Sequence, residues 1–226
     1  MWDAAGHDHP ASGKPLMSSD VPVRVLSGDL PGNLADTFAR SRRIAWDVET
    51  TGLDWRRERI GTCQLFAEAV GTVVVSVGKG RPSALARLIE DSTVEKVFHH
   101  APFDLRFMVS AWQVLPAAIR DTKVASKILN PAAPNQAHSL QQLVGRYLGV
   151  SLPKGAVRVS DWSASELTDE QVRYAAGDVV YLLRLLDVME KTLRASGRAE
   201  LYDSCCAFLP ARVTLELGDF PDVFGY

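Results

Sequence analysis

The stretch RIAWDVETTGLDW, Arg43–Trp55, is the most informative part of the sequence for the fold. It has the apolar residues of a strand, and two acids stand among them. Its β-branched and aromatic residues predict a strand. Side chains alternate along a strand, so Asp47 and Glu49 project from one face, roughly 7 Å apart, while Trp46 and Val48 project from the other. Two acids on one face repel each other unless water solvates both, as on an edge strand, or a cation lies between them.

The overall composition is that of a globular domain. The chain has 226 residues, of which 46% are hydrophobic and 23% charged, and its formal net charge is −2. A protein that coats long duplex nucleic acid usually carries a basic surplus, so we expect any nucleic-acid contact to be short or local. No run of 18 apolar residues predicts a membrane span. Three cysteines make no disulfide framework and no signal peptide opens the chain, which predicts a cytoplasmic location.

The periodicity predicts one domain of the α/β class. Residues 1–20 are polar and unpatterned and are expected to be a disordered leader, followed by a single domain over residues 21–226. Strands are expected at residues 44–48, 59–67, 72–77 and 96–100, and helices at 83–91 and 103–112, with helices dominating afterwards. Asp121 or Thr122 is expected to cap one of these later helices. Thr168 and Gln171 form a capping box ahead of a long helix that should end near Arg194.

Two further motifs carry acids. Asp104 lies in the first turn of a helix, where the helix dipole would stabilise an acid in any case. Tyr174 and Asp178 are four residues apart and share one helix face. Asp178 lies in an apolar run, so it requires a partner, either a structural Arg or Lys or a bound cation. Together with the two strand acids, these carboxylates suit Mg²⁺ or Mn²⁺, and four of them would need about two divalent ions.

The order of these motifs resembles that of a known family. The segments WDVETTGL, VFHHAPFDL and LTDEQVRYAAGDVVYLL resemble the three motifs of the DEDD exonuclease superfamily, in its tyrosine-bearing, ribonuclease D-like branch. DTKVASKIL, SDWSASELTDEQ and CCAFLPARVTLELGDFPDVF are similar to the nanoRNase C (NrnC) family, so the resemblance covers residues from about 22 to 226. It implies an α/β ribonuclease H-like (DnaQ-type exonuclease) fold, with a mixed five-stranded sheet flanked by helices.

The resemblance also implies an activity. It is that of a metal-dependent 3′→5′ exoribonuclease that hydrolyses dinucleotides and other short oligoribonucleotides to nucleoside 5′-monophosphates, with two Mg²⁺ or Mn²⁺ ions per active site. Tyr174 would orient the attacking water, because a free phenol with a pKa of about 10 is a poor base at neutral pH. The implied catalytic residues are Asp47, Glu49, Asp104, Tyr174 and Asp178, of which the four acids are the metal ligands. The implied substrate-binding residues are Thr50, Gly52, Leu53, His100, Phe103 and Trp162.

The expected partners follow from the same resemblance. They are short single-stranded RNA, with DNA ends as a second possibility, and further copies of the chain in a homo-oligomer built from dimers, up to an octameric ring. The apolar C-terminal tail is expected at the subunit interface. Two alternatives stay open: ribonuclease D-like trimming of longer structured RNA or DNA 3′ ends through a local patch of Arg56, Arg57 and Arg59, and a catalytically inactive nucleic-acid-binding module.

Overall fold

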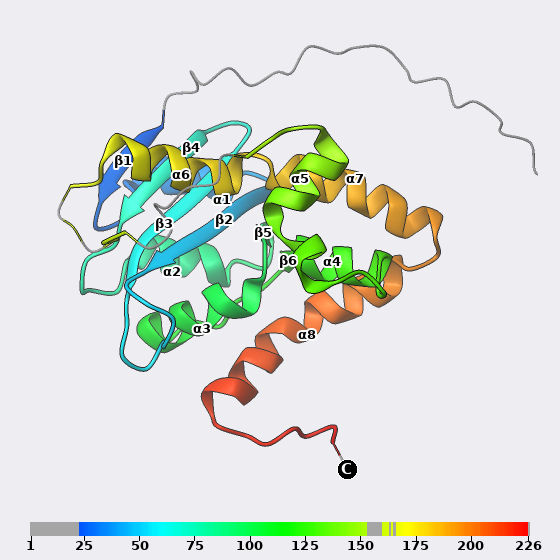
Figure 1. The fold of residues 1–226 in the computed structure, drawn as a ribbon. Coiled ribbons are helices and arrows are strands. Elements are labelled where there is room, and N and C mark those ends of the chain that lie inside the picture. Colours follow the sequence, from blue (N-terminus) through cyan, green and yellow to red (C-terminus); the bar gives the residue numbers. More distant parts are fainter. Residues whose placement is uncertain (1–22, 153–159, 163, 165, 226) are drawn as a thin grey trace, which may run out of the picture.

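The computed structural model describes residues 23–152, 160–162, 164 and 166–225. The expected leader, residues 1–20, lies outside the described residues. The described chain forms three layers, a mixed sheet with helices on both faces (Figure 1). Helices α2 and α3 lie on one side of the sheet, and α6 and α7 lie on the other. The predicted α/β fold is therefore confirmed.

The sheet has six strands in the order β1-β4-β3-β2-β5-β6, one strand more than expected. The three strands expected at residues 44–48, 59–67 and 72–77 form an antiparallel meander, since β2 pairs with β3 and β3 with β4 in antiparallel fashion. The other three pairs, β1 with β4, β2 with β5 and β5 with β6, are parallel. The strands are β1 (Arg24–Ser27), β2 (Arg43–Thr50), β3 (Ile60–Ala67), β4 (Gly71–Ser76), β5 (Glu95–Phe98) and β6 (Ile119–Asp121).

The helices include the predicted ones, with one break and one further helix, Gly32–Ala39, that was not predicted. The predicted long helix after Thr168 is two helices, because the chain leaves the helical path at Tyr181. The predicted capping box of Thr168 and Gln171 is present at its start. The helices are α1 (Gly32–Ala39), α2 (Ser83–Glu90), α3 (Ala101–Trp112), α4 (Thr122–Leu129), the 3₁₀ helix η1 (Asn135–His138), α5 (Leu140–Leu148), α6 (Asp169–Val180), α7 (Leu182–Ala195) and α8 (Ala199–Leu217).

The two faces of β2 have different surroundings, as the alternation of side chains requires. Ile44, Trp46 and Val48 are buried in the larger hydrophobic cluster, together with residues of α1, α2 and α3. Ala45 belongs to a second cluster, which α4, α5, α7 and α8 complete. Helix α6 packs across β2, β3 and β4. The acids of β2 therefore face the side of the sheet that α6 and α7 cover.

One buried carboxylate fixes the start of two helices. Asp121 at the end of β6 accepts hydrogen bonds from the backbone N–H groups of His100 (3.3 Å) and Ala101 (2.7 Å), at the start of α3. It also accepts from Lys123 (2.7 Å) and Val124 (3.0 Å), and thus caps α4 as predicted. Because no side chain of its own segment caps α3, Asp121 sets the position of this helix and of the acid that it carries.

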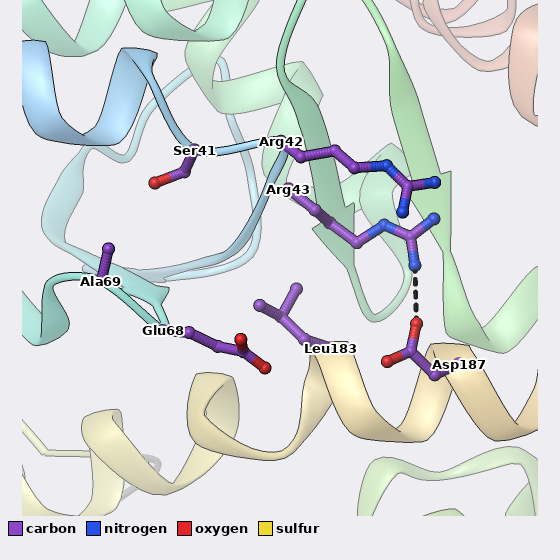
Figure 2. A pocket seen from close by; sticks show the side chains of 7 residues that line it. All are labelled: Ser41, Arg42, Arg43, Glu68, Ala69, Leu183 and Asp187. Atoms are coloured by element: carbon purple, nitrogen blue, oxygen red, sulfur yellow. Dashed lines mark hydrogen bonds and ion pairs between the residues drawn. The ribbon is translucent and has the colours of Figure 1, made fainter.

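At its other end, β2 is anchored to the rest of the domain by Arg43. Its guanidinium pairs with Glu95 of β5 and with Asp187 and Glu190 of α7. Figure 2 shows Arg43 reaching Asp187 at the edge of a small cavity of about 340 Å³. Since Arg43 is already satisfied by three acids, we interpret this end of the strand as structural, remote from the acids at the opposite end.

Candidate active site

Three carboxylates from two elements meet at the end of β2. Oxygen atoms of Asp47, Glu49 and Asp178 all lie within 4.8 Å of one another. The first two follow from the alternation of β2, and the third comes from the last turns of α6. Asp104 of α3, only 2% exposed, accepts a hydrogen bond of 3.1 Å from the Val48 N–H in the same strand. The structure thus brings the four predicted acids to one cavity, which all of them line.

The pKa values of Asp47, Asp104 and Asp178 are those of buried carboxyl groups that lie close to other acids. Burial, and then the charges of Asp104, Asp178 and Glu49, raise the pKa of Asp47 well above its ordinary value. Burial likewise raises the pKa of Asp104. The pKa of Asp178 rises to about 7 because of its burial, and a hydrogen bond from Tyr174 opposes this shift. No ion pair within the described part of the chain involves Asp47, Asp104 or Asp178.

These observations test whether the residues fit a divalent cation. Hard carboxylate oxygens are the ligands that Mg²⁺ and Mn²⁺ prefer, and they converge here within 4.8 Å. The raised pKa values agree with this, because burial, and for Asp47 also the charges of neighbouring acids, favours the protonated carboxyl, whereas a bound cation would favour the carboxylate. The donor set therefore fits a divalent metal site.

The tyrosine is held by the helix that carries Asp178. Tyr174 and Asp178 are one turn apart on α6, and the Tyr174 hydroxyl donates to the Asp178 carboxylate. The capping box starts α6 with two reciprocal bonds, Thr168 N to Gln171 Oε1 at 2.9 Å and Gln171 N to Thr168 Oγ1 at 3.2 Å. Local sequence therefore fixes where the phenol stands relative to the acids.

The acids open into a cavity of about 730 Å³. Of the predicted substrate-binding residues, Thr50, Gly52, Leu53, His100 and Phe103 line it. Leu53 is 83% exposed, so its apolar side chain is accessible to a ligand in the cavity. Phe103 also packs against Phe107 and the core, so its ring serves both the cavity and the fold.

The cavity lining also contains a cation and two uncharged histidines. Lys123 is the only lysine or arginine among the described lining residues. Burial, followed by the charge of Lys123, lowers the pKa of His100 to about 4 and that of His99 to about 3, so both rings are neutral at pH 7. His100 has a φ of 76°, a left-handed conformation that the bond to Asp121 helps to hold.

Trp162 corrects one sequence-based expectation. We expected a substrate contact, but its side chain is 1% exposed and lies against Tyr174, with ring centroids 6.1 Å apart. It does not line the cavity. The sequence analysis in turn did not identify Thr51, His99, Lys123, Ser139, Leu140 and Ser160 as lining residues. Most of them come from loops and helix starts distant in sequence, so that no local spacing indicates them.

Comparisons with known proteins agree with this geometry. A family model described as 3′-5′ exonuclease matches residues 25–194. The chain belongs to the 3′-5′ exonuclease family. Within this family it is ribonuclease D-like and close to NrnC, as the sequence motifs predict. Ribonuclease D of Gluconacetobacter diazotrophicus is 36% identical over 147 residues, which are 65% of this chain and 36% of the relative. The chain thus spans little more than a third of that relative's length.

Solved structures of Brucella melitensis NrnC match over nearly their whole length. NrnC bound to pGG is 31% identical with a TM-score of 0.83, and the match covers 92% of this chain and 100% of that one. NrnC with bound Mg²⁺ is 31% identical with a TM-score of 0.81, covering 90% and 98%. This exonuclease fold therefore accommodates a divalent ion and a short nucleotide ligand in a relative of the same size.

Two further expectations concern the surface. Within the described part of the chain, no helix combines the length and apolarity needed to cross a membrane. In the arginine patch that a longer RNA would need, Arg56 pairs with Asp219, and Arg57 pairs with Asp54 at 3.6 Å. Their charges are therefore partly compensated within the chain.

Proposed function

We propose that this exonuclease hydrolyses short oligoribonucleotides, dinucleotides to a few nucleotides, from the 3′ end in a divalent-metal-dependent reaction that uses two ions. The observation that supports this most directly is the cluster of carboxylate oxygens from Asp47, Glu49 and Asp178, which lie within 4.8 Å of one another and line the cavity. Asp104 would complete the ligand set from α3. The bound Mg²⁺ of the NrnC structure supports the choice of ion.

The chain's own residues would act as follows. Tyr174, donating to Asp178, would orient the attacking water toward the last phosphodiester. The P–O3′ bond breaks, so the terminal nucleoside 5′-monophosphate leaves and the shortened chain keeps a 3′-hydroxyl. Divalent cations held by the acids would make water more acidic and offset the charge that develops on the phosphate.

The size of the cavity supports a short substrate. A volume of about 730 Å³ lies within the range of about 300–1,000 Å³ of pockets that enclose small ligands. The near-neutral chain adds to this, because a substrate with few phosphates releases few counterions and needs no long basic groove. NrnC with pGG is a relative whose ligand has this size.

The remaining wall residues would hold the substrate. Leu53, largely exposed, would insert beside the terminal base, and Thr50 and Gly52 would contact the terminal nucleotide. Lys123, the cation among the described lining residues, would attract a second phosphate. His100 and Phe103 would offer neutral faces to a base or sugar.

We further propose that the chain works as a homo-oligomer. A C-terminal apolar surface, made of Phe208, Phe220, Val223 and Phe224, lines one cavity at the end of α8. Phe220 and Phe224 are 58% and 77% exposed. Large contiguous exposed apolar patches are rare on monomers, and a second copy of the chain is the proposed cover.

A competition assay tests the proposed substrate. A labelled dinucleotide and a labelled long structured RNA are mixed in equal amounts with the protein and Mg²⁺, and the loss of each is followed. We expect the dinucleotide to disappear first and nucleoside 5′-monophosphate to be the product. Preferential loss of the long RNA would instead support ribonuclease D-like trimming. Replacing that RNA with single-stranded DNA tests the sugar preference.

A further inference from the structure

Trp162 faces the tyrosine from the buried side. Its indole is 1% exposed and lies 6.1 Å from the Tyr174 ring centroid, with 43° between the planes. Val74 of β4 and Ala175 of α6 complete the small cluster around it. The indole therefore forms a buried wall against the phenol, and of the two rings only the phenol lines the substrate cavity.

Two contacts fix this wall in place. At Gly61 of β3, a Cβ would lie 2.8 Å from the carbonyl carbon of Trp162. Only glycine therefore allows the backbone of Trp162 to approach the strand this closely. Gln171, which closes the capping box of α6, also donates through Nε2 to Ser160 Oγ (3.0 Å) and to the Asp161 carbonyl (3.1 Å). Residues 160–162 are thus hydrogen-bonded to the helix that carries Tyr174.

The contact between the two rings carries the inference, and the indole nitrogen does not. Trp162 Nε1 is buried and has no hydrogen-bond partner among the described residues, but the same holds for Trp46 Nε1 in the larger core cluster. An unpaired buried N–H costs free energy wherever it lies. What distinguishes Trp162 is that its ring lies against the phenol of Tyr174, a residue of the cavity lining.

We propose that Trp162 is a positioning residue of the exonuclease reaction, whose indole holds the Tyr174 hydroxyl in its bond with Asp178. This inference rests on the proposed function, in which Tyr174 orients the attacking water. Without the wall, the phenol ring gains room to turn about its side-chain bonds, and its hydroxyl leaves Asp178 in a fraction of the molecules. Substrate and metal contacts remain, so turnover falls while binding does not.

A double-mutant cycle tests this. Trp162→Leu, Tyr174→Phe and the double variant are compared with the parent chain in steady-state hydrolysis of pGG with Mg²⁺. We expect Trp162→Leu to lower kcat by about 10- to 100-fold, the range of a misplaced reacting group, with KM unchanged. In the Tyr174→Phe background it should cause no further loss, because the hydroxyl that it positions is gone. Trp162→Phe should recover most of the activity.

Trp112→Leu is the matched control. Trp112 is a tryptophan of similar burial, 2% exposed, which packs into the larger core cluster from the last position of α3 and does not line the cavity. Its replacement should lower the melting temperature but keep kcat at temperatures well below the transition. If Trp162→Leu does not fold, Gly61→Ala enters the same cycle, since it displaces the Trp162 segment from β3.

Three results would overturn the proposal, and they differ from one another. An equal loss of kcat in the parent and Tyr174→Phe backgrounds would mean that Trp162 acts independently of the phenol. A rise in KM without a loss of kcat would make it a substrate contact. Full activity of Tyr174→Phe would remove the proposed role of Tyr174 itself, and the positioning role with it.

Discussion

Asp178 is the residue in which burial, charge and position coincide most clearly. It lies in the acid cluster, accepts from Tyr174 and has a pKa of about 7. Asp178→Asn keeps the shape but removes one ligand charge. We expect kcat to fall by at least about 10²-fold, because losing a metal contact removes several kcal/mol of transition-state stabilisation. Steady-state kinetics with pGG measures this, and circular dichroism checks the fold.

Asp187→Asn is the matched control for that substitution. Asp187 is an exposed acid on the next helix, paired with Arg43 at the far end of β2 (Figure 2). Its replacement should leave kcat unchanged. Equal activity of both variants and the parent would refute the assignment of the acid cluster as the active site.

The pH dependence of metal binding follows from the raised pKa values of Asp47, Asp104 and Asp178. The folded, metal-free chain holds protons that the unfolded chain releases near pH 4. Its stability therefore falls as the pH rises from about 4 to about 7. Divalent ions compete with the same protons. We expect the rise in melting temperature on adding Mg²⁺ to be larger at pH 7.5 than at pH 5.5, in scans against an EDTA reference.

The same experiment with Asp178→Asn supplies its control. With one titrating acid removed, the effect of Mg²⁺ should be smaller and should depend less on pH. A Mg²⁺ effect on the parent chain that is equal at both pH values would contradict the prediction, because it would locate the binding groups away from the buried acids.

Residue-level prediction succeeded where the information is local. The alternation of β2 puts Asp47 and Glu49 on one face, and a spacing of four puts Tyr174 beside Asp178. Trp162 is the opposite case. Its burial depends on the absence of a side chain at Gly61 in a distant strand, which no spacing around the tryptophan reveals.

At the scale of the element, Asp121 is the decisive cap. It accepts four backbone N–H bonds at the starts of α3 and α4 and is fully buried. A single N-cap contributes about 1–2 kcal/mol, so we expect Asp121→Ala to lower the free energy of unfolding by about 2–4 kcal/mol. Urea unfolding measures this. Activity should fall too, because α3 carries Asp104 into the cluster.

Asp29→Ala is a graded control for this cap. Asp29 accepts from Ala84 N (2.7 Å) and Leu85 N (3.1 Å) and so caps only α2, which carries none of the four acids. We expect a loss of about 1–2 kcal/mol and an unchanged kcat. If the two variants lost equal stability, the double role of Asp121 would be wrong.

The elements themselves were predictable to the extent that they carry local signals. The capping box of Thr168 and Gln171 and the left-handed Gly149 after α5 mark helix ends correctly. The break at Tyr181 has no Pro or Gly to announce it, so the continuing helical pattern predicted one helix. Strands β1 and β6 have four and three residues, which are too few for a periodic pattern in the sequence. They become strands by pairing with their neighbours in the sheet.

At the scale of the molecule, the sheet joins two clusters with different tasks. The larger cluster, on the face of Trp46 and Val48, packs around β2 with residues of α1, α2 and α3 and supports the strand. The opposite face holds the acids, α6 and the cavity. Packing on the other side of the same strand thus offsets the free-energy cost of burying like charges.

The C-terminal apolar surface gives the last prediction at this scale. Helix α8 leads away from the sheet, and the chain end after it carries Phe220 and Phe224 (Figure 1). If copies of the chain cover this surface, a charge in it should separate them. We expect the parent chain to sediment as an oligomer and Phe224→Asp to shift it toward the monomer, at an unchanged melting temperature of the domain, because Phe224 is 77% exposed.

Leu115→Asp is the matched control, since Leu115 is 79% exposed but lies apart from the C-terminal apolar surface. It should leave sedimentation unchanged. A monomeric parent chain at micromolar concentration would contradict the proposed assembly, while leaving the acid cluster and its chemistry intact, because every ligand of that cluster comes from one chain. The two proposals are therefore separable: assembly would concern the C-terminal surface, and hydrolysis the opposite face of β2.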